Sequence, residues 1–314
     1  METTESPSEP YYGQLGAFIR RNPVALKELR GRMRGVRTFI ILTIFVGLMS
    51  AFAVVLYLVY TASNPLSLSA SGGAIGKLIF GGVVAVELFL VCFISPAFTA
   101  GAISSERERQ TYDLLRTTLL PARRLVAGKL LAALAFVVLL LVVAIPLQSL
   151  AFLMGGVIMT EVILSIVLLI TTAVGYGAVG IYFSARTQKT LSASVLTYTF
   201  ALFTTVALPL VTLALVGFMT GLTFAIDNAL IASLWEALAQ YIALFLSATN
   251  PISASVLTEI VLLNQGTIGV YSATLSNGTS IPLVSPWILY ILLYTLATLV
   301  MIRATVKEVQ KVDV

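Results

Sequence analysis

The side chains best suited to chemistry in water are gathered in one short stretch of this chain, residues 95–129. The stretch follows an apolar run, passes into the dense polar sequence Ser104–Asp113, and closes on Pro121 and the basic pair Arg123-Arg124. Closely spaced carboxylates and guanidinium groups form charge-assisted hydrogen bonds. A chain that concentrates its charge between two apolar runs is expected to use that loop to contact a partner in water.

Catalytic chemistry has few candidates in the rest of the chain. There is no histidine, which removes His-dependent triads, His metal sites and imidazole proton relays. The single cysteine, Cys92, lies in an apolar run, where it is expected to be a small buried side chain. No G-x-x-x-x-G-K-S/T motif occurs, so the chain has no P-loop for ATP. We therefore expect that this chain is not an enzyme by itself and that it binds no metal or cofactor.

Glu87 is the one acidic residue well inside an apolar run. At the bilayer centre an acid costs roughly 2.5–3.5 kcal/mol, so its side chain should face the protein interior or a water-filled cavity. Two interpretations stay open: a group on a substrate or proton path, or a hydrogen-bonded anchor to a neighbouring helix, protonated or paired with Tyr, Ser or Thr. Pro96 and Pro209 join Glu87 as candidates for a translocation path, because irregular backbone is tolerated where it lines a cavity.

The composition requires most of the surface to face lipid. The chain is 58% hydrophobic and only 11% charged, whereas a soluble domain carries roughly 25% charged residues. Six uncharged or nearly uncharged runs are long enough for the ~30 Å hydrocarbon core. We predict an all-α integral membrane protein with six spans, at residues 39–60, 78–103, 130–154, 162–182, 191–218 and 287–302.

The basic residues orient these spans. Eighteen of the nineteen Lys and Arg residues fall on one side of the predicted membrane and only Lys77 on the other, which places both termini in the cytoplasm. Residues 1–12 are predicted to be a disordered tail. Residues 13–37 carry seven basic side chains and begin a helix at Asn22-Pro23, so we expect an interfacial helix on anionic lipid rather than a nucleic-acid site.

The segment 220–286 complicates the count of spans. Leu230–Leu246 is almost long enough to cross, but its polar residues fall on one helical stripe, and a crossing would put the basic C-terminus outside. We predict a re-entrant or interfacial helix on the outer side, broken at Asn250-Pro251 and followed by a second short helix. Asn277-Gly278-Thr279 fits a glycosylation sequon, but Asn-Gly is first of all a turn signal.

The polar loop is itself expected to be helical. Ser105-Glu106-Arg107-Glu108 has the pattern of a capping box. Glu106 with Arg109, and Arg109 with Asp113, have the spacing of ion pairs along a helix. These features predict a short helix over residues 105–115, either a solvated connector or a docking helix for a cytoplasmic partner.

The same residues resemble a known family. Pro96-Ala97, Thr99–Ser104, Glu106-Arg107-Glu108, Gln110-Thr111 and Asp113-Leu114-Leu115, with Gly128-Lys129 at the next span, are similar to the signature of ABC-2 type permeases. These are membrane subunits of ATP-binding-cassette exporters, with the type V exporter-like fold. Asn22-Pro23-Val24, Lys27–Arg30 and the loop Ser184–Ser194 also match the family pattern.

The resemblance implies partners and roles. Two permease copies, identical or similar, would form a twelve-helix unit above two separate ATP-binding subunits, which hold the ATP and Mg²⁺. Spans two and five would line the route. The resemblance implies an ATPase-coupling helix with Ser105, Glu106, Arg107, Glu108, Arg109, Thr111, Asp113 and Leu114. It implies an interfacial helix with Asn22, Pro23, Lys27, Glu28 and Arg30. It implies an outer gate formed by the re-entrant helices, with Trp235, Glu236, Gln240, Asn250 and Pro251.

We therefore expect a permease subunit of an ATP-driven exporter in the plasma membrane of a bacterial or archaeal cell. The alternative is a self-contained secondary transporter or channel that uses Glu87 in the membrane. No inverted repeat or chain of intramembrane acids and bases supports the alternative.

Overall fold

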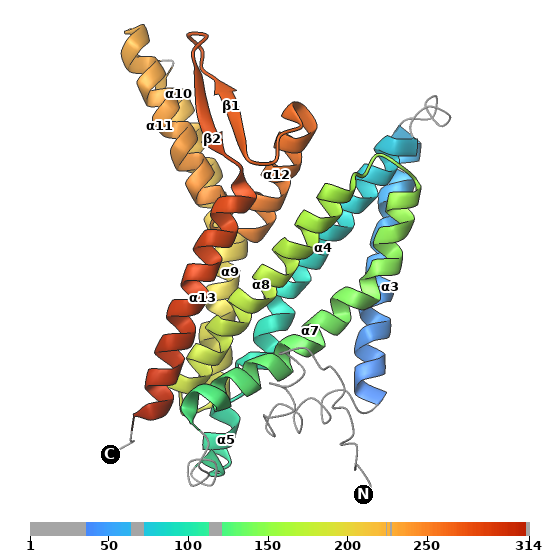
Figure 1. Ribbon diagram of the computed structural model, residues 1–314, viewed down its shortest axis with the longest axis vertical. Helices are drawn as coiled ribbons and strands as arrows, with labels where there is room; N and C mark the ends of the chain where they lie inside the picture. Colours follow the sequence, from blue (N-terminus) through green and yellow to red (C-terminus); the bar gives the residue numbers. More distant parts are fainter. Residues whose placement is uncertain (1–35, 64–71, 113–120, 224, 227, 312–314) are drawn as a thin grey trace, which may run out of the picture.

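The computed structural model describes residues 36–63, 72–112, 121–223, 225–226 and 228–311. Long helices lie side by side along most of its length (Figure 1). The predicted tail and nearly all of the predicted interfacial helix, with Asn22, Pro23, Lys27, Glu28 and Arg30, lie outside the described residues.

Within the described residues, seven helices are long and apolar enough to cross a membrane. Six of them coincide with the predicted spans, and the chain is a multi-pass membrane protein. Five of these six are α3 (Val36–Ser63), α4 (Gly72–Thr99), α7 (Ala122–Leu153), α8 (Met159–Arg186) and α13 (Pro286–Gln310). The other, which precedes α11 in the chain, is one continuous helix made of α9 (Thr190–Leu202), the π-helix η1 (Phe203–Ala207) and α10 (Leu208–Thr223). The seventh, α11 (Ala229–Ser247), falls in the segment predicted to be re-entrant.

The main hydrophobic core joins α3, α4, α7 and α8, with side chains such as Val83, Leu88 and Leu140 fully or almost fully buried. α8 approaches α4 closely because small residues line it, and a Cβ at Gly180 would overlap Thr99 Oγ1. Five small residues of α8 are all buried: Ala173, Gly175, Gly177, Ala178 and Gly180. Close approach of backbones is a common basis of helix association in lipid.

The prolines inside the predicted spans differ in their effect on the helical backbone. Pro96 and Pro146 lie inside the continuous helices α4 and α7. Pro209 is the second residue of α10 and lies two residues after the π-helix η1, a wider turn that often marks a functional position in a helix. The irregular backbone expected near prolines is therefore found at Pro209.

The segment between α10 and α13 has more structure than the sequence predicted. After α11, the helix α12 (Pro251–Gln265) runs back, and the strands β1 (Val270–Thr274) and β2 (Ser280–Val284) form an antiparallel hairpin. The hairpin was not predicted from the sequence, but the turn at Asn277-Gly278 was. In that turn Gly278 has φ of 82°, and Asn277 Oδ1 accepts a hydrogen bond from the Thr279 N–H.

Two ends of the bundle can be told apart in Figure 1. The α5 end carries the short helix α5 (Ser104–Glu108) and the C-terminus. At the opposite end, the hairpin end, α10 and α11 with the β-hairpin stand apart from the ends of α4 and α7, and α12 lies between the two groups (Figure 1).

Candidate functional site

α5 is shorter than the predicted coupling helix, residues 105–115. It ends at Glu108 because the next turn closes as a Schellman motif, in which Gln110 N–H donates to Arg107 O and Thr111 N–H donates to Glu106 O. Gln110 sits in the left-handed region, with φ of 58°, where glycine is the usual residue. The predicted capping box is wrong as well: Ile103 is the N-cap residue, and the Ser105 hydroxyl donates to Gly101 O. Asp113 and Leu114 lie outside the described residues.

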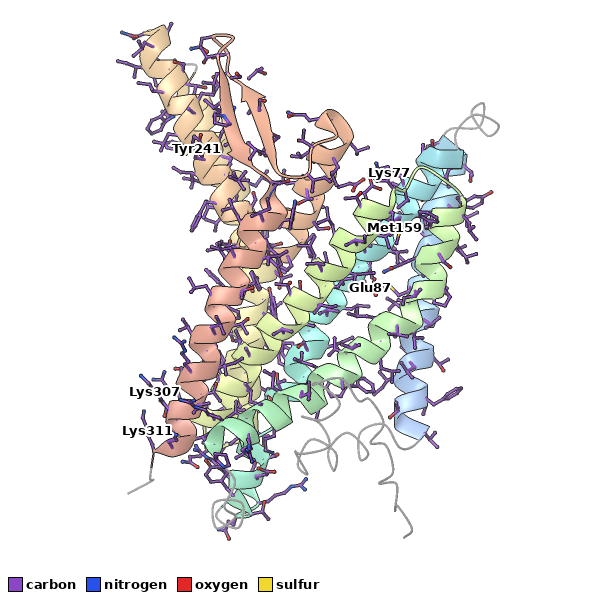
Figure 2. All side chains as sticks on the ribbon, viewed as in Figure 1. Lys77, Glu87, Met159, Tyr241, Lys307 and Lys311 are labelled. Carbon is purple, nitrogen blue, oxygen red and sulfur yellow. The ribbon has the colours of Figure 1, made fainter. Side chains whose placement is uncertain are left out.

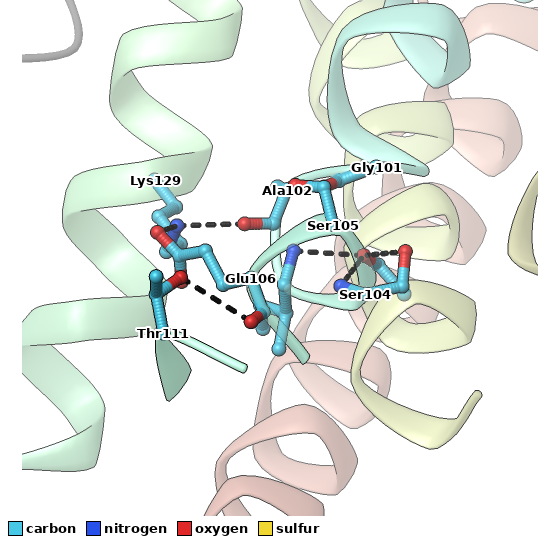
Figure 3. Close-up of polar contacts among 9 residues, drawn as sticks. Gly101, Ala102, Ser104, Ser105, Glu106, Thr111 and Lys129 are labelled. Atoms are coloured by element: carbon cyan, nitrogen blue, oxygen red, sulfur yellow. Dashed lines mark hydrogen bonds and ion pairs between the residues drawn. The ribbon is translucent and has the colours of Figure 1, made fainter. Parts of the chain in front are cut away.

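Glu106 points back into the bundle (Figure 3). Lys129, in the first turns of α7, is 1% exposed, and its Nζ lies 2.7 Å from Glu106 Oε1 and 2.6 Å from Ala102 O. The predicted pairing of Glu106 with Arg109 is therefore replaced by an ion pair to another helix. A buried ammonium group is tolerated where a carboxylate and a carbonyl compensate its lost hydration.

Two further contacts join α5 to α8 and α9. The buried hydroxyl of Ser184, in the last turns of α8, accepts from Ile103 N–H at 2.9 Å and Ser104 N–H at 3.0 Å. The Glu108 carboxylate accepts from the Thr190 N–H at 3.2 Å and from the Thr190 hydroxyl. A carboxylate at the start of α9 satisfies a free N–H and complements the helix dipole.

The chain after α5 continues these connections. The Arg107 guanidinium lies 4.9 Å from the centre of the Tyr112 ring, and the Tyr112 hydroxyl donates to Val309 O in α13 at 3.4 Å. Arg109 and Thr111 are exposed. The α5 junction, meaning residues 101–112 with their contacts, thus reaches four long helices while its tip stays accessible.

A second polar cluster lies halfway along the bundle, at the α11–α12 tip (residues 248–250). Pro209 has no N–H to give to the carbonyls one turn earlier. The side-chain amide of Asn250 donates to two of them, Thr204 O at 2.6 Å and Thr205 O at 3.2 Å. Asn250 Oδ1 also accepts from Ser253 N–H, so this 1% exposed residue caps α12 as well.

Aromatic hydroxyls complete this tip. Tyr294 of α13 donates to Thr249 O at 3.0 Å, and the Tyr176 and Thr204 hydroxyls lie 2.9 Å apart. Every one of these groups would be costly to leave unpaired in lipid. The tip is therefore fixed to the middle of the fifth predicted span and to α13.

The other predicted gate residues hold α11 in place. Trp235 donates through Nε1 to Met219 O of α10, and the Glu236 carboxylate accepts from the N–H and hydroxyl of Ser276 in the hairpin turn. Gln240 Oε1 is buried with no hydrogen-bond partner among the described residues. Pro251 is the first residue of α12.

Glu87 is fully buried in α4, and Figure 2 shows it in the middle of the bundle. Its Oε2 accepts from Gln148 Nε2 of α7 at 2.6 Å. The geometry is that of an anchor between helices, with glutamine in place of the Tyr, Ser or Thr expected as partner. Pro96, the second path candidate on α4, is buried in the same bundle.

The sequence did not predict the partners of the site residues, which are Lys129, Gln148, Ser184 and Thr190. Gln148 carried a signal, as a polar residue inside an apolar run. Lys129 stood in the family pattern, but nothing in the sequence paired it with Glu106.

The polar contacts of both clusters join separate helices at their ends and midpoints. Among the described residues there is no group of three His, Cys, Asp or Glu side chains that could hold a metal ion.

Comparisons with known proteins agree with this architecture. No curated protein sequence matches the chain. The family model described as ABC-2 family transporter protein matches residues 22–302, which include the long helices described above except for the last residues of α13. The chain belongs to the ABC-2 transporter family, as a membrane permease.

Proposed function

We propose that this chain is the permease subunit of an ATP-driven exporter, in which α5 is the coupling helix. Two copies of a separate ATP-binding subunit dock on the α5 end and hold the ATP and Mg²⁺. Closure of these subunits on ATP moves α5 and switches the pathway from inward-open to outward-open.

The observation that carries the proposal is the set of contacts at α5. Lys129, Ser184 and Thr190 tie its backbone and carboxylates to α7, α8 and α9. Arg109 and Thr111 remain exposed at its far end. A partner that pushes on this end would displace three helices together, which a solvated connector would not require.

The orientation follows from charge. Lys307 and Lys311 lie at the α5 end (Figure 2), and Lys77 is the one Lys or Arg side chain that the structure describes near the hairpin end. The α5 end, where α3 begins and α13 ends, therefore faces the cytoplasm, and we infer that both termini lie on that side. The α11–α12 hairpin is a re-entrant element on the outer side, because its tip at Asn250 reaches only to Thr204 in the middle of a span. Six helices then cross the plasma membrane.

A second permease chain completes the pathway. As in α3, α11 and α13, only 17% of the most apolar window of α9–η1–α10 is buried in this chain, against 61% for α8. The second copy would cover this face, and the α11–α12 hairpins of the two copies would form the outer gate. Membrane lipid surrounds the remaining faces, and no nucleic acid takes part.

The first test is co-purification of the tagged chain with a P-loop ATPase from native membranes. Arg109→Glu reverses an exposed charge on α5 and should reduce co-elution and uncouple ATP hydrolysis from transport, with the melting temperature of the permease unchanged. Lys307→Glu, an exposed reversal at the same end but away from α5, is the matched control. Glu106→Lys is a poor probe, because it also breaks the buried pair with Lys129. Equal co-elution and coupling of the Arg109 and Lys307 variants would exclude α5 as the docking element.

A further inference from the structure

Three charged side chains meet at the hairpin end, and each comes from a different helix. Lys77 Nζ of α4 lies 2.7 Å from Glu161 Oε1 of α8 and 3.3 Å from Glu259 Oε1 of α12. Figure 2 shows Lys77 at the hairpin end of the bundle. We call Lys77, Glu161 and Glu259 the Lys77 cluster. It joins the re-entrant hairpin to the membrane-spanning helices.

The two carboxylates are held very differently. The Glu161 side chain is 2% exposed, and its second oxygen, Oε2, accepts from Ile158 N–H at the start of α8. The Glu259 side chain is 30% exposed, and its Oε1 makes no hydrogen bond among the described residues despite lying near Lys77. The Lys77–Glu161 pair is therefore part of the helix bundle, and the Lys77–Glu259 contact is the weaker one.

Packing beneath the cluster is incomplete. A cavity of about 170 Å³ separates α12 from α4 and α8, lined mainly by apolar side chains such as Phe80, Leu164 and Ile260. Asn250 fixes one end of α12, and Glu259 lies eight residues after Pro251, or about 12 Å further along the helix axis. Between these two points, Ala254 packs against Leu168 of α8 and Tyr290 of α13, whereas further along α12 the cavity separates the helix from α4 and α8.

We propose that Lys77 is a positioning residue of the outer gate, which holds α12 against α4 and α8 by bridging Glu161 and Glu259. When the gate opens, the Lys77–Glu259 contact breaks, the Lys77–Glu161 pair stays, and α12 swings about the Asn250 tip. This inference rests on the proposed gate function of the α11–α12 hairpin.

The charges around Glu259 predict how the contact responds to pH. Burial raises the pKa of Glu259 above the usual value, the nearby Glu161 carboxylate raises it further, and Lys77 lowers it. On the other helices packed against α12, Glu236 and Tyr241 of α11 bind the β-hairpin, and Tyr290 of α13 pairs with Thr172. As the outer pH falls, Glu259 takes up a proton at a higher pH than an ordinary glutamate, and its attraction to Lys77 is lost.

Glu259→Gln is the sharpest variant, because it imitates the protonated residue and leaves the Lys77–Glu161 pair intact. Spin labels on the exposed positions Leu78 of α4 and Leu263 of α12, introduced in a Cys92→Ala background, report their separation in the full-length permease in nanodiscs. We expect Glu259→Gln to raise the long-distance population at neutral pH roughly two- to fivefold, the size expected for one partly exposed ion pair. In the unsubstituted chain the same population should rise as pH falls, and in Glu259→Gln it should not respond to pH.

Two more variants separate positioning from folding. Lys77→Met should also open α12, and Lys77→Arg should restore the closed distance and the pH response. Glu308→Gln, at the α5 end, should change neither. A pH response that persists in Glu259→Gln would overturn the inference. So would distances in Glu259→Gln and Lys77→Met that equal those of the unsubstituted chain. The distances need no ATPase, so the inference can fail or hold independently of the docking test at Arg109.

Discussion

Lys129 and Glu106 form an ion pair that joins α5 to α7: the Lys129 side chain is 1% exposed, and its Nζ lies 2.7 Å from Glu106 Oε1. Removing the lysine leaves both this carboxylate and Ala102 O without their donor. We expect Lys129→Met to lower the free energy of unfolding by roughly 1–3 kcal/mol. Thermal unfolding in nanodiscs measures the effect.

Lys311→Met is the control for that prediction, because its ion pair with Glu308 is solvent-exposed on the lysine side and is expected to contribute about 0–1 kcal/mol. Equal losses in the two variants would mean that the Lys129 pair adds nothing through its burial.

The contact between Glu108 and Thr190 should govern the first turn of α9. Glu108→Ala removes an acceptor for the Thr190 N–H and hydroxyl, so fraying of this turn should increase. Hydrogen exchange should therefore accelerate at the amides of residues 190–193, and Thr190→Val should show a smaller change. Unaltered exchange in Glu108→Ala would show that the carboxylate does not restrain α9.

The two roles of Asn250 can be separated by substitution. Asn250→Asp keeps an acceptor for Ser253 N–H but replaces the amide donor with an oxygen that faces the carbonyls of Thr204 and Thr205. We expect this variant to be destabilised by roughly 1–3 kcal/mol, at least as much as Asn250→Ala, because two buried carbonyls lose their donor and meet a negative charge.

The matched control is Asn228→Ala, which removes an exposed cap of α11 and no contact to η1. If Asn250→Asp melted at the same temperature as the unsubstituted chain, capping alone would explain the residue, and the link between the α11–α12 tip and Pro209 would be lost.

Glu87 and Gln148 should behave as a structural pair. Glu87→Gln preserves a hydrogen-bond acceptor for Gln148 and should leave stability nearly unchanged, whereas Glu87→Leu leaves the Gln148 amide unpaired. A double-mutant cycle with Gln148→Leu should give a coupling energy of about 0.6 kcal/mol, and at most roughly 1.7 kcal/mol. A secondary transporter that uses Glu87 would instead show proton flux in proteoliposomes that Glu87→Gln abolishes.

Much of the fold could be predicted because the bilayer imposes a length on each apolar run. The cores of α3, α7 and α8 agree with the predicted spans, and the break at Asn250-Pro251 is where α11 gives way to α12. The ends of the helices agree less well: α7 begins at Ala122 rather than at residue 130, and α13 continues to Gln310. A helix can continue beyond the membrane wherever its polar residues still favour helical backbone. Hydropathy predicts the apolar part of such a helix but not its polar ends.

What the sequence by itself determined is therefore local: apolar runs, a polar loop, a proline that removes a donor. Only the tertiary structure decided which groups meet. Glu106 pairs with Lys129, 23 residues away, and Asn250 reaches Thr204, 46 residues away. Glu106 was predicted to pair with the nearby Arg109, but it pairs with Lys129 instead. A buried charge or carbonyl needs a partner at the place where it is buried, whereas an exposed arginine can be hydrated by water. The length of α5 also depends on tertiary structure, since its end at Glu108 is set by a Schellman turn with Gln110, rather than glycine, at the left-handed position.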